Sequence, residues 1–355
     1  MSNISLSALL PPLRILILGY GHVTRAFLPL LASRSEWLGR ETGIRPVIIG
    51  IGSRSQGLYS HSSGIDVESL AREQDPIQWF KSSGTRVENF ETFIQAGEKA
   101  GASLFIELTT LNPRDGQPAL RHIRKAIESG MDVITANKGP VAYAQRELQS
   151  LARRFGVQFR FESAVMDGLP LINLSELTLP AVGIQSFKAT LNATSTLVLK
   201  MIEQGYSLDE AITKAQDAGI AEADPWYDLD GWDAVMKTTI LANSLLEGNL
   251  TPKMVKREGI RNLTSDEICA AALAGSPYRL VCQAYRKNGI VLAEVRPRRI
   301  NSEDTLHLGI GTAGVITIET ESMGVITLVE HEPAVIQTAY GILSDLITIQ
   351  RKKNT

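Results

Sequence analysis

The sequence predicts an α/β protein in which a doubly wound parallel sheet is followed by a second, α+β domain. One observation is that short apolar runs alternate with helical patterns up to residue 155, an order typical of a parallel sheet with right-handed crossovers. The other is that polar and apolar residues alternate in the runs after residue 156, which favours half-buried antiparallel strands. The chain of 355 residues, 44% of them hydrophobic, is long enough for two cores.

The first strands and helices follow from local pattern. An apolar run from Ile15 to Leu18, two glycines and an apolar pattern of helical period predict strand, tight turn and helix. Further strands are expected at PVIIGIGS, SLFIELTT and MDVITANK, and helices at PALRHIRKAIESG, stopped by Gly130, and GPVAYAQRELQSLARRFG, with Pro140 in its first turn and Gly156 at its end.

The second half carries its own signals. VQFRFES and IQSFKATLNATS alternate as antiparallel strands do, and SLDEAITKAQDAG begins with a capping box of Ser207 and Glu210. VCQAYRKNGIVLAEVRPRRI predicts a hairpin that turns at Asn288 and Gly289. PAVIQTAYGILSDLITIQRK predicts a closing amphipathic helix.

Charge and composition limit the kinds of molecule that the protein is expected to bind. A formal net charge of −2 argues against a nucleic-acid partner and favours a small-molecule substrate. No apolar run approaches the length of a bilayer, and no basic segment opens the chain, so we expect a cytoplasmic protein with no membrane partner. Cys269 and Cys282 match no common zinc spacing and are expected to be apolar thiols in a reducing compartment.

The first candidate site is a dinucleotide fingerprint between the first strand and helix. Gly19 permits the tight turn, Gly21 allows close approach of a pyrophosphate, and the helix that starts at His22 and Val23 presents unpaired N–H groups. Thr24 stands where the third glycine is usual. The motif predicts a Rossmann-type nucleotide-binding domain, with an ordinary strand-to-helix turn as the alternative.

The end of the second strand indicates which nucleotide is bound. Ser53 and Arg54 stand where an NAD-binding fold presents an acidic residue, and an arginine there can accept a 2′-phosphate. We therefore expect NADP, with NAD possible; the alternative is that Arg54 is an ordinary loop arginine. Thr109 and Asn137 lie at the ends of two other predicted strands and are assigned to the same cofactor site.

Two lysines are candidate catalytic groups. Lys138 lies at the carboxyl end of a predicted parallel strand, at the sheet edge where ligands gather, so it can serve as a proton donor or as a positive charge. Lys237 lies one helical turn after Asp233, in a helix that continues with mostly apolar residues. Asp230 is expected to cap that helix.

Carboxylates surround the second lysine. Glu222, Asp224 and Asp228 precede the helix in a loop and form a nest suited to an ammonium group. A solvated salt bridge would explain Asp233 and Lys237 alone, but buried charges need a partner or a ligand. The pattern therefore predicts a candidate amino-acid site in this stretch.

These motifs resemble the homoserine dehydrogenase family over nearly the whole chain. TANKGP is similar to the family segment T-A-N-K-x-P, and FESAVMDGLPLI to its loop E-A-x-V-x-x-G-x-P-I-I. The family signature A-x-x-x-G-x-A-E-x-D-P-x-x-D-x-x-G-x-D-x-x-x-K is matched by Ala215, Gly219, Ala221, Glu222, Asp224, Pro225, Asp228, Gly231, Asp233 and Lys237.

The resemblance implies NAD(P)-dependent interconversion of L-homoserine and L-aspartate 4-semialdehyde. It implies that Lys237 and Lys138 lie at the reacting oxygen, and that the amino and hydroxyl ends of the substrate are held by Glu222, Asp228 and Asp233. It implies as well that a sodium-like ion is bound near Glu162, Val165 and Asp167. It also implies a homodimer and three segments: a dinucleotide-binding domain over 1–155, a substrate-binding and dimerisation domain over 156–330, and a helix over 331–355 that returns to the nucleotide domain.

Several positions depart from the family pattern. Thr24 replaces a glycine, NATST replaces N-G-T-T-N, and Glu330 to Ala334 replace a glycine-rich turn. These departures leave two other functions open: a related dehydrogenase acting on another small amino or hydroxy aldehyde, and a non-catalytic homologue that binds a nucleotide or an amino acid. The presence of Lys138, Asp233 and Lys237 together argues against the non-catalytic homologue, because a protein that only binds has no need of the second lysine.

Overall fold

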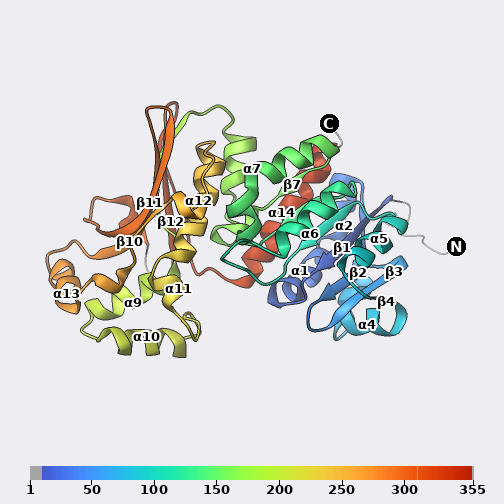
Figure 1. The fold of residues 1–355 in the computed structure, drawn as a ribbon, viewed down its shortest axis with the longest axis horizontal. Helices are drawn as coiled ribbons and strands as arrows, with labels where there is room; N and C mark the ends of the chain where they lie inside the picture. The colour runs from blue at the N-terminus through green and yellow to red at the C-terminus, as the bar shows by residue number, and fades with distance from the viewer. Residues whose placement is uncertain (1–9, 310, 354–355) are drawn as a thin grey trace. The chain divides into compact units, whose positions relative to one another are not determined.

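The computed structural model describes residues 10–309 and 311–353 and divides the chain into two compact units. Unit 1 comprises Met1–Pro170 and Ala334–Thr355, and unit 2 comprises Leu171–Pro333. The predicted fold class is confirmed, because unit 1 is an α/β structure and unit 2 is built on a second sheet (Figure 1). The units divide later than the predicted boundary after residue 155.

Unit 1 contains a seven-stranded sheet in the order β4-β3-β2-β1-β5-β6-β7. Five of its strands run parallel: β1 (Pro12–Leu18), β2 (Arg45–Ser53), β5 (Leu104–Glu107), β6 (Asp132–Thr135) and β7 (Phe159–Arg160). The sheet is not wholly parallel, because the turn at 54–56 reverses the chain. β3 (Gly57–Asp66) is antiparallel to β2, and β4 (Thr85–Val87) is antiparallel to β3.

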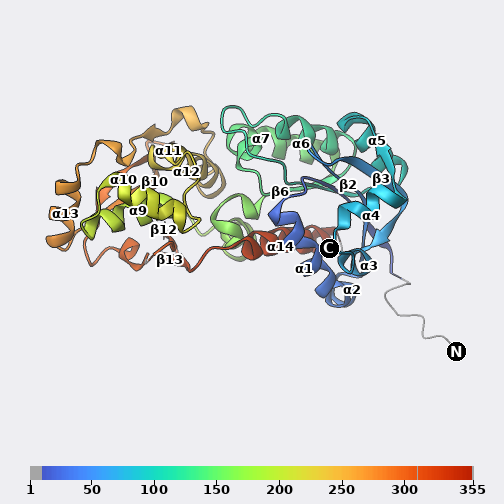
Figure 2. The same cartoon turned by 90° about the horizontal axis from the view of Figure 1, so that it is seen from below.

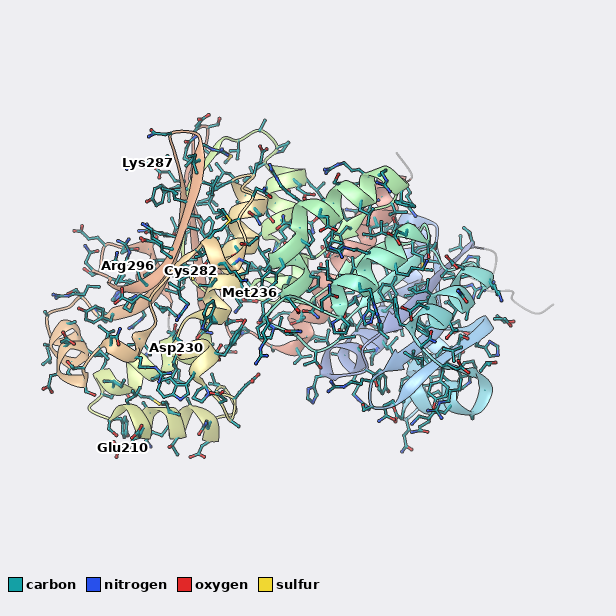
Figure 3. All side chains as sticks on the ribbon, viewed as in Figure 1. Glu210, Asp230, Met236, Cys282, Lys287 and Arg296 are labelled. Carbon is teal, nitrogen blue, oxygen red and sulfur yellow. The ribbon has the colours of Figure 1, made fainter. Side chains whose placement is uncertain are left out.

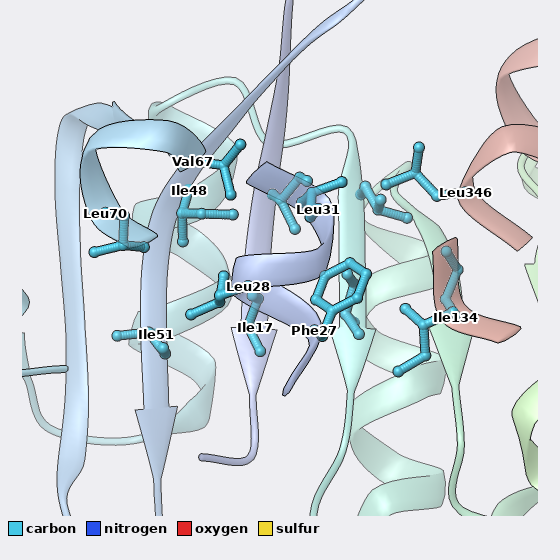
Figure 4. Close-up of a cluster of buried hydrophobic side chains, with 14 of the residues drawn as sticks. Ile17, Phe27, Leu28, Leu31, Ile48, Ile51, Val67, Leu70, Ile134 and Leu346 are labelled. Carbon is cyan, nitrogen blue, oxygen red and sulfur yellow. The ribbon is translucent and has the colours of Figure 1, made fainter. Parts of the chain in front are cut away.

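Helices bury their apolar faces against this sheet. They are α1 (His22–Ser33), α2 (Ser35–Thr42), α3 (Val67–Ala71), α4 (Pro76–Ser83), α5 (Phe90–Lys99), α6 (Ala119–Glu128), α7 (Lys138–Phe155) and α14 (Val335–Lys353). Figure 4 shows Ile17 of β1, Leu31 of α1 and Leu346 of α14 in one cluster of buried side chains. The last helix of the chain thus packs beside α1 (Figure 2).

Unit 2 contains a six-stranded sheet in the order β13-β12-β8-β10-β11-β9. Its strands are β8 (Ile184–Thr190), β9 (Lys256–Arg257), β10 (Tyr278–Lys287), β11 (Ile290–Arg299), β12 (Gly314–Thr320) and β13 (Gly324–Glu330), all paired antiparallel except β9 with β11. Its α-helices are α8 (Leu171–Asn173), α9 (Ala193–Glu203), α10 (Leu208–Asp217), α11 (Trp226–Leu229), α12 (Trp232–Leu245) and α13 (Ser265–Leu273).

Two local predictions in unit 2 are confirmed. The capping box of Ser207 and Glu210 is present at the start of α10. The β10–β11 hairpin turns at Asn288 and Gly289, which have φ of 51° and 77°. Both residues have the positive φ that this two-residue turn requires, and Lys287 beside the turn is labelled in Figure 3.

Two other local predictions are wrong. The segment VQFRFES is not an antiparallel strand of the second domain, because β7 within it pairs parallel with β6 in unit 1. Asp230, which is labelled in Figure 3, does not cap α12. The N-cap is Gly231, and the Asp230 carboxylate instead accepts hydrogen bonds from Arg261 at 3.0 and 2.9 Å. A guanidinium satisfies both carboxylate oxygens at once, which a helix N–H cannot do.

The two cysteines form no disulfide, and Cys282 on β10 is buried. Within the part of the chain that the structure describes, no helix is long and apolar enough to cross a membrane.

Candidate active site

The nucleotide-binding loop joins β1 to α1. Gly19 has φ of +114°, and a Cβ at this position would lie 2.2 Å from the Leu108 carbonyl oxygen, so only glycine fits. Gly21 is the N-cap of α1, and a Cβ there would meet no heavy atom within 4 Å. The first turn of α1 contains no acidic residue and its N-cap makes no side-chain hydrogen bond. Its N–H groups and dipole therefore suit an anion.

Side chains around the loop fix its shape. Thr24, at the third-glycine position, is fully buried and its hydroxyl donates to the Gly19 carbonyl at 2.6 Å. The Tyr20 hydroxyl donates to Asp75, and Arg25 lies 4.3 Å from the centre of the Tyr20 ring. Burial and the hydrogen bond with Asp75 raise the pKa of Tyr20 to about 12. The Thr24 hydroxyl thus holds the loop to the first turn of α1 through this hydrogen bond. A glycine at this position has no side chain that could form it.

A cavity of about 940 Å³ opens beside this loop. Five of the eight predicted cofactor residues line it: Gly19, Gly21, Ser53, Arg54 and Thr109. The other three do not line it: His22 and Val23 lie in the first turn of α1, and Asn137 caps α7. Lining residues that were not predicted include Arg86, Phe90, Arg121 and His122.

The two glycines of this loop should respond differently to alanine substitution. Gly19→Ala should lower the free energy of unfolding by at least about 1–3 kcal/mol, because the positive φ and the Leu108 carbonyl both exclude a side chain. Gly21→Ala should leave that free energy within about 0.5 kcal/mol but weaken nucleotide binding, because the methyl group enters the open space. Urea unfolding and nucleotide titration measure the two effects. Equal loss of stability in both variants would contradict this account.

A buried carboxylate, Glu107, organises the sheet edge behind the cavity. It accepts hydrogen bonds from the backbone N–H of Thr109 at 2.9 Å, from the Thr109 hydroxyl, and from the Thr135 hydroxyl at 2.9 Å. Glu107 is fully buried, and that burial raises the pKa of its carboxyl group. Sequence reasoning missed this residue. The available signal was a single acidic residue at the end of an apolar strand.

The predicted catalytic Lys138 belongs to this same edge. It is the first residue of α7, directly after Asn137, whose side chain accepts from the Gly139 N–H at 3.1 Å and donates to the Thr109 carbonyl at 3.1 Å. The Asn137 N–H donates to the Thr135 hydroxyl at 3.0 Å. Glu107, Thr109, Thr135 and Asn137 therefore form a closed polar ring that fixes the backbone from which the half-buried Lys138 extends.

The second candidate cluster lies in unit 2, around Lys237. Its ammonium group donates to the Leu191 carbonyl at 2.6 Å and lies 3.0 Å from the Asp233 carboxylate. Only 18% of the Lys237 side chain and 8% of the Asp233 side chain are exposed, so this is not a solvated surface pair. Asn192 bridges the two predicted aspartates, donating to Asp228 at 2.8 Å and to Asp233 at 3.0 Å.

The neighbouring Asp228 is held on its other side by Thr194, whose hydroxyl donates to it at 2.9 Å. Burial, and secondarily the charge of Asp233, raise the pKa of Asp228. Glu222 and Asp224 differ from it, because both are exposed. The structure thus brings together Asp228, Asp233 and Lys237, and adds Asn192 and Thr194, which lie in the NATST segment that departs from the family pattern.

The residues implied for an ion lie in unit 1, in two short 3-10 helices at Glu162–Ala164 and Met166–Gly168. Glu162 is almost fully buried, whereas Asp167 has φ of 43° and accepts from the Thr338 hydroxyl at 3.2 Å. Among the described residues, no group of three or more His, Cys, Asp or Glu side chains could hold a metal ion. Any ion there would need backbone oxygens in addition to side-chain carboxylates.

The fold is α/β, with a dinucleotide-type glycine loop in unit 1 and a cluster of largely buried charged side chains in unit 2, features typical of an enzyme that acts on a small molecule. Residues 170–347 match the family model described as homoserine dehydrogenase. The chain is 34% identical to the NAD(+)-dependent homoserine dehydrogenase of Pseudomonas canavaninivorans, over 95% of this chain and 96% of that protein. The chain belongs to the homoserine dehydrogenase family.

Two further similar proteins are also homoserine dehydrogenases by name. The chain is 31% identical to the homoserine dehydrogenase of Methanocaldococcus jannaschii over 94% of this chain and 98% of that protein. A solved structure of a hyperthermophilic archaeal homoserine dehydrogenase mutant in complex with NADPH has a TM-score of 0.78 and 28% identity, covering 96% of this chain and 98% of that chain.

Proposed function

We propose that the protein interconverts L-aspartate 4-semialdehyde and L-homoserine with a nicotinamide nucleotide. The observation that carries this proposal is the half-buried Lys237 beside Asp233 and Asp228. A lysine there can exchange a proton with an alcohol or aldehyde oxygen, and the two carboxylates can hold an ammonium group. These are the two ends of homoserine. Family membership supports the same reaction.

In the reductive direction, a bound reduced nicotinamide supplies the hydride. Lys237 donates a proton to the aldehyde oxygen as negative charge develops on it, and takes the proton back in the oxidative direction. The Leu191 carbonyl and Asp233 direct the ammonium group of Lys237, because each accepts one of its protons. Asp228, Asp233 and the exposed Glu222 bind the amino group and hydroxyl end of the substrate. We assign Lys138 the role of a second cation at the developing charge.

The proposed cofactor is NADP. The names of the relatives do not decide between NADP and NAD, because one relative is NAD(+)-dependent and the structure of another contains NADPH. The proposal therefore rests on this chain's own Arg54, which lines the cavity next to Ser53 in the β2–β3 turn. An arginine at that position can bind the 2′-phosphate that NAD lacks.

Absorbance at 340 nm tests the reaction. Purified protein is mixed with aspartate 4-semialdehyde and NADPH, and the assay is repeated with NADH and with a panel of other short aldehydes. We expect NADPH oxidation that depends on aspartate 4-semialdehyde and is slower with NADH. If the protein turns over only a different aldehyde, that aldehyde takes the place of aspartate 4-semialdehyde as the proposed substrate. Nucleotide binding without turnover of any aldehyde would support the non-catalytic homologue.

Substrate binding should depend on pH through Asp228. Its carboxyl group has a raised pKa and binds an ammonium group only when it is deprotonated. The KM for homoserine should therefore rise as the pH falls through that pKa. Asp228→Asn should raise KM about tenfold to a hundredfold and remove this pH dependence. Initial rates across pH measure both effects; the same pH dependence in Asp228→Asn would assign it to another group.

We also propose two finer features. A monovalent ion bound by oxygens near Glu162, Val165 and Asp167 is supported by the buried carboxylate of Glu162 and by the family resemblance. A homodimer formed through unit 2 is supported by the resemblance and by exposed apolar side chains on its sheet, among them Ile290, Leu292 and Val325.

A further inference from the structure

A second arginine, Arg86, lines the same cavity as Arg54. Both side chains are exposed, and neither makes a hydrogen bond or an ion pair with other residues that the structure describes. The residues that line the cavity include three arginines, Arg54, Arg86 and Arg121, and one acidic residue, Glu88. Arg121 lies 3.8 Å from the Glu91 carboxylate. The wall therefore carries uncompensated positive charge that suits an anionic group of the bound molecule.

Strand register brings Arg86 toward Arg54. Leu58 of β3 pairs with Gly52 of β2 on one side and with Val87 of β4 on the other. Arg86 is the residue before Val87, and Arg54 lies in the turn that follows Ser53. Neighbouring strands are about 4.8 Å apart. Arg86 itself pairs with Tyr59, which pairs with Ile51 of β2, so the two arginine backbones lie toward the same end of the three strands β2, β3 and β4.

The turn that carries Arg54 is held in place. The Gln56 N–H donates to the Ser53 hydroxyl at 3.1 Å, and the Lys81 ammonium group donates to the Gln56 side-chain oxygen at 2.6 Å. Arg86 extends from a strand paired with β3. Two arginines on supported backbone can bind a tetrahedral dianion from two directions, because each guanidinium presents a fork of N–H donors.

We propose that Arg86 and Arg54 together bind the 2′-phosphate of NADP, so that Arg86 is a second residue that determines cofactor specificity. This inference rests on the proposed use of NADP. It follows from the antiparallel β3–β4 extension, which brings a residue some thirty positions later in the sequence to the cofactor cavity. A phosphate monoester carries up to two negative charges near pH 7, so two guanidinium groups match it better than one.

Nucleotide titration of the full-length protein tests the inference. Dissociation constants are measured for NADP⁺, NAD⁺, 2′,5′-ADP and 5′-AMP with wild-type protein, Arg86→Gln, Arg54→Gln and the control Arg40→Gln, an exposed arginine of α2 that does not line the cavity. We expect Arg86→Gln to weaken NADP⁺ and 2′,5′-ADP by about tenfold to a hundredfold while NAD⁺ and 5′-AMP change less than twofold.

The variants separate this inference from the cofactor proposal. If Arg54→Gln loses discrimination between 2′,5′-ADP and 5′-AMP while Arg86→Gln keeps it, the role of Arg86 is wrong and NADP binding by Arg54 stands. If wild-type protein does not discriminate between these ligands, NADP preference itself is wrong. Equal weakening of all four ligands by Arg86→Gln would show that Arg86 supports the fold of the cavity and not specificity. Far-UV circular dichroism of each variant checks folding.

Discussion

Lys237→Met should lower kcat by about a hundredfold to ten-thousandfold, the range expected when a general acid is lost. Methionine keeps most of the side-chain volume but cannot donate a proton. The Asp233 carboxylate retains a hydrogen bond from Asn192, so the cluster keeps part of its polar pairing. Nucleotide affinity should not change, because the cofactor cavity is lined wholly by residues of unit 1.

The control for this variant is Lys253→Met, which changes an exposed lysine of the same unit. It should leave kcat within twofold of the wild-type value. A kcat near the wild-type value in Lys237→Met would show that Lys237 takes no part in the chemical step. Loss of nucleotide affinity together with kcat would instead indicate that the substitution damages the fold.

Asp345→Ala should lower the free energy of unfolding by about 3–5 kcal/mol, the cost of leaving one member of a buried ion pair without its partner. Asp345 on α14 is fully buried, lies 3.4 Å from the Arg160 guanidinium and accepts from the Glu162 N–H at 2.8 Å. Its loss would remove this carboxylate from the buried Arg160 guanidinium and from the Glu162 N–H. Urea unfolding measures the change.

The matched control is Glu147→Ala, which removes the exposed ion pair with Arg124 in the same unit. Exposed pairs contribute about 1 kcal/mol or less. Similar values for the two substitutions would contradict the importance of the buried pair. Asp345→Asn, which keeps an oxygen that can accept from the Glu162 N–H, should fall between them.

The parts of the fold that sequence predicted correctly depend on local rules. The strand, turn and helix around Gly19 follow from an apolar run, glycines and helical period, and the β10–β11 turn follows from Asn288 and Gly289. The antiparallel β3 and β4 were not predicted. β4 is only three residues long, and β3 contains a polar stretch, SHSSG, that carries no clear strand period.

The sequence predicted individual residues of the candidate sites but not the hydrogen bonds that connect them. Asp228, Asp233 and Lys237 were found because they lie close together in the sequence. Asn192, which joins the two aspartates, is 36 and 41 residues away from them, and its role depends on tertiary packing. The Glu107 network likewise depends on the pairing of β5 with β6, which no local pattern reveals.

Isotope transfer tests the central claim most directly. The protein is incubated with aspartate 4-semialdehyde and reduced nucleotide deuterated at the transferable position of nicotinamide C4, and the amino-acid product is analysed by mass spectrometry. We predict homoserine that carries one deuterium on its hydroxyl-bearing carbon, formed by wild-type protein and Lys253→Met and strongly reduced with Lys237→Met. Absence of deuterated homoserine from folded, nucleotide-binding wild-type protein would contradict the proposed function.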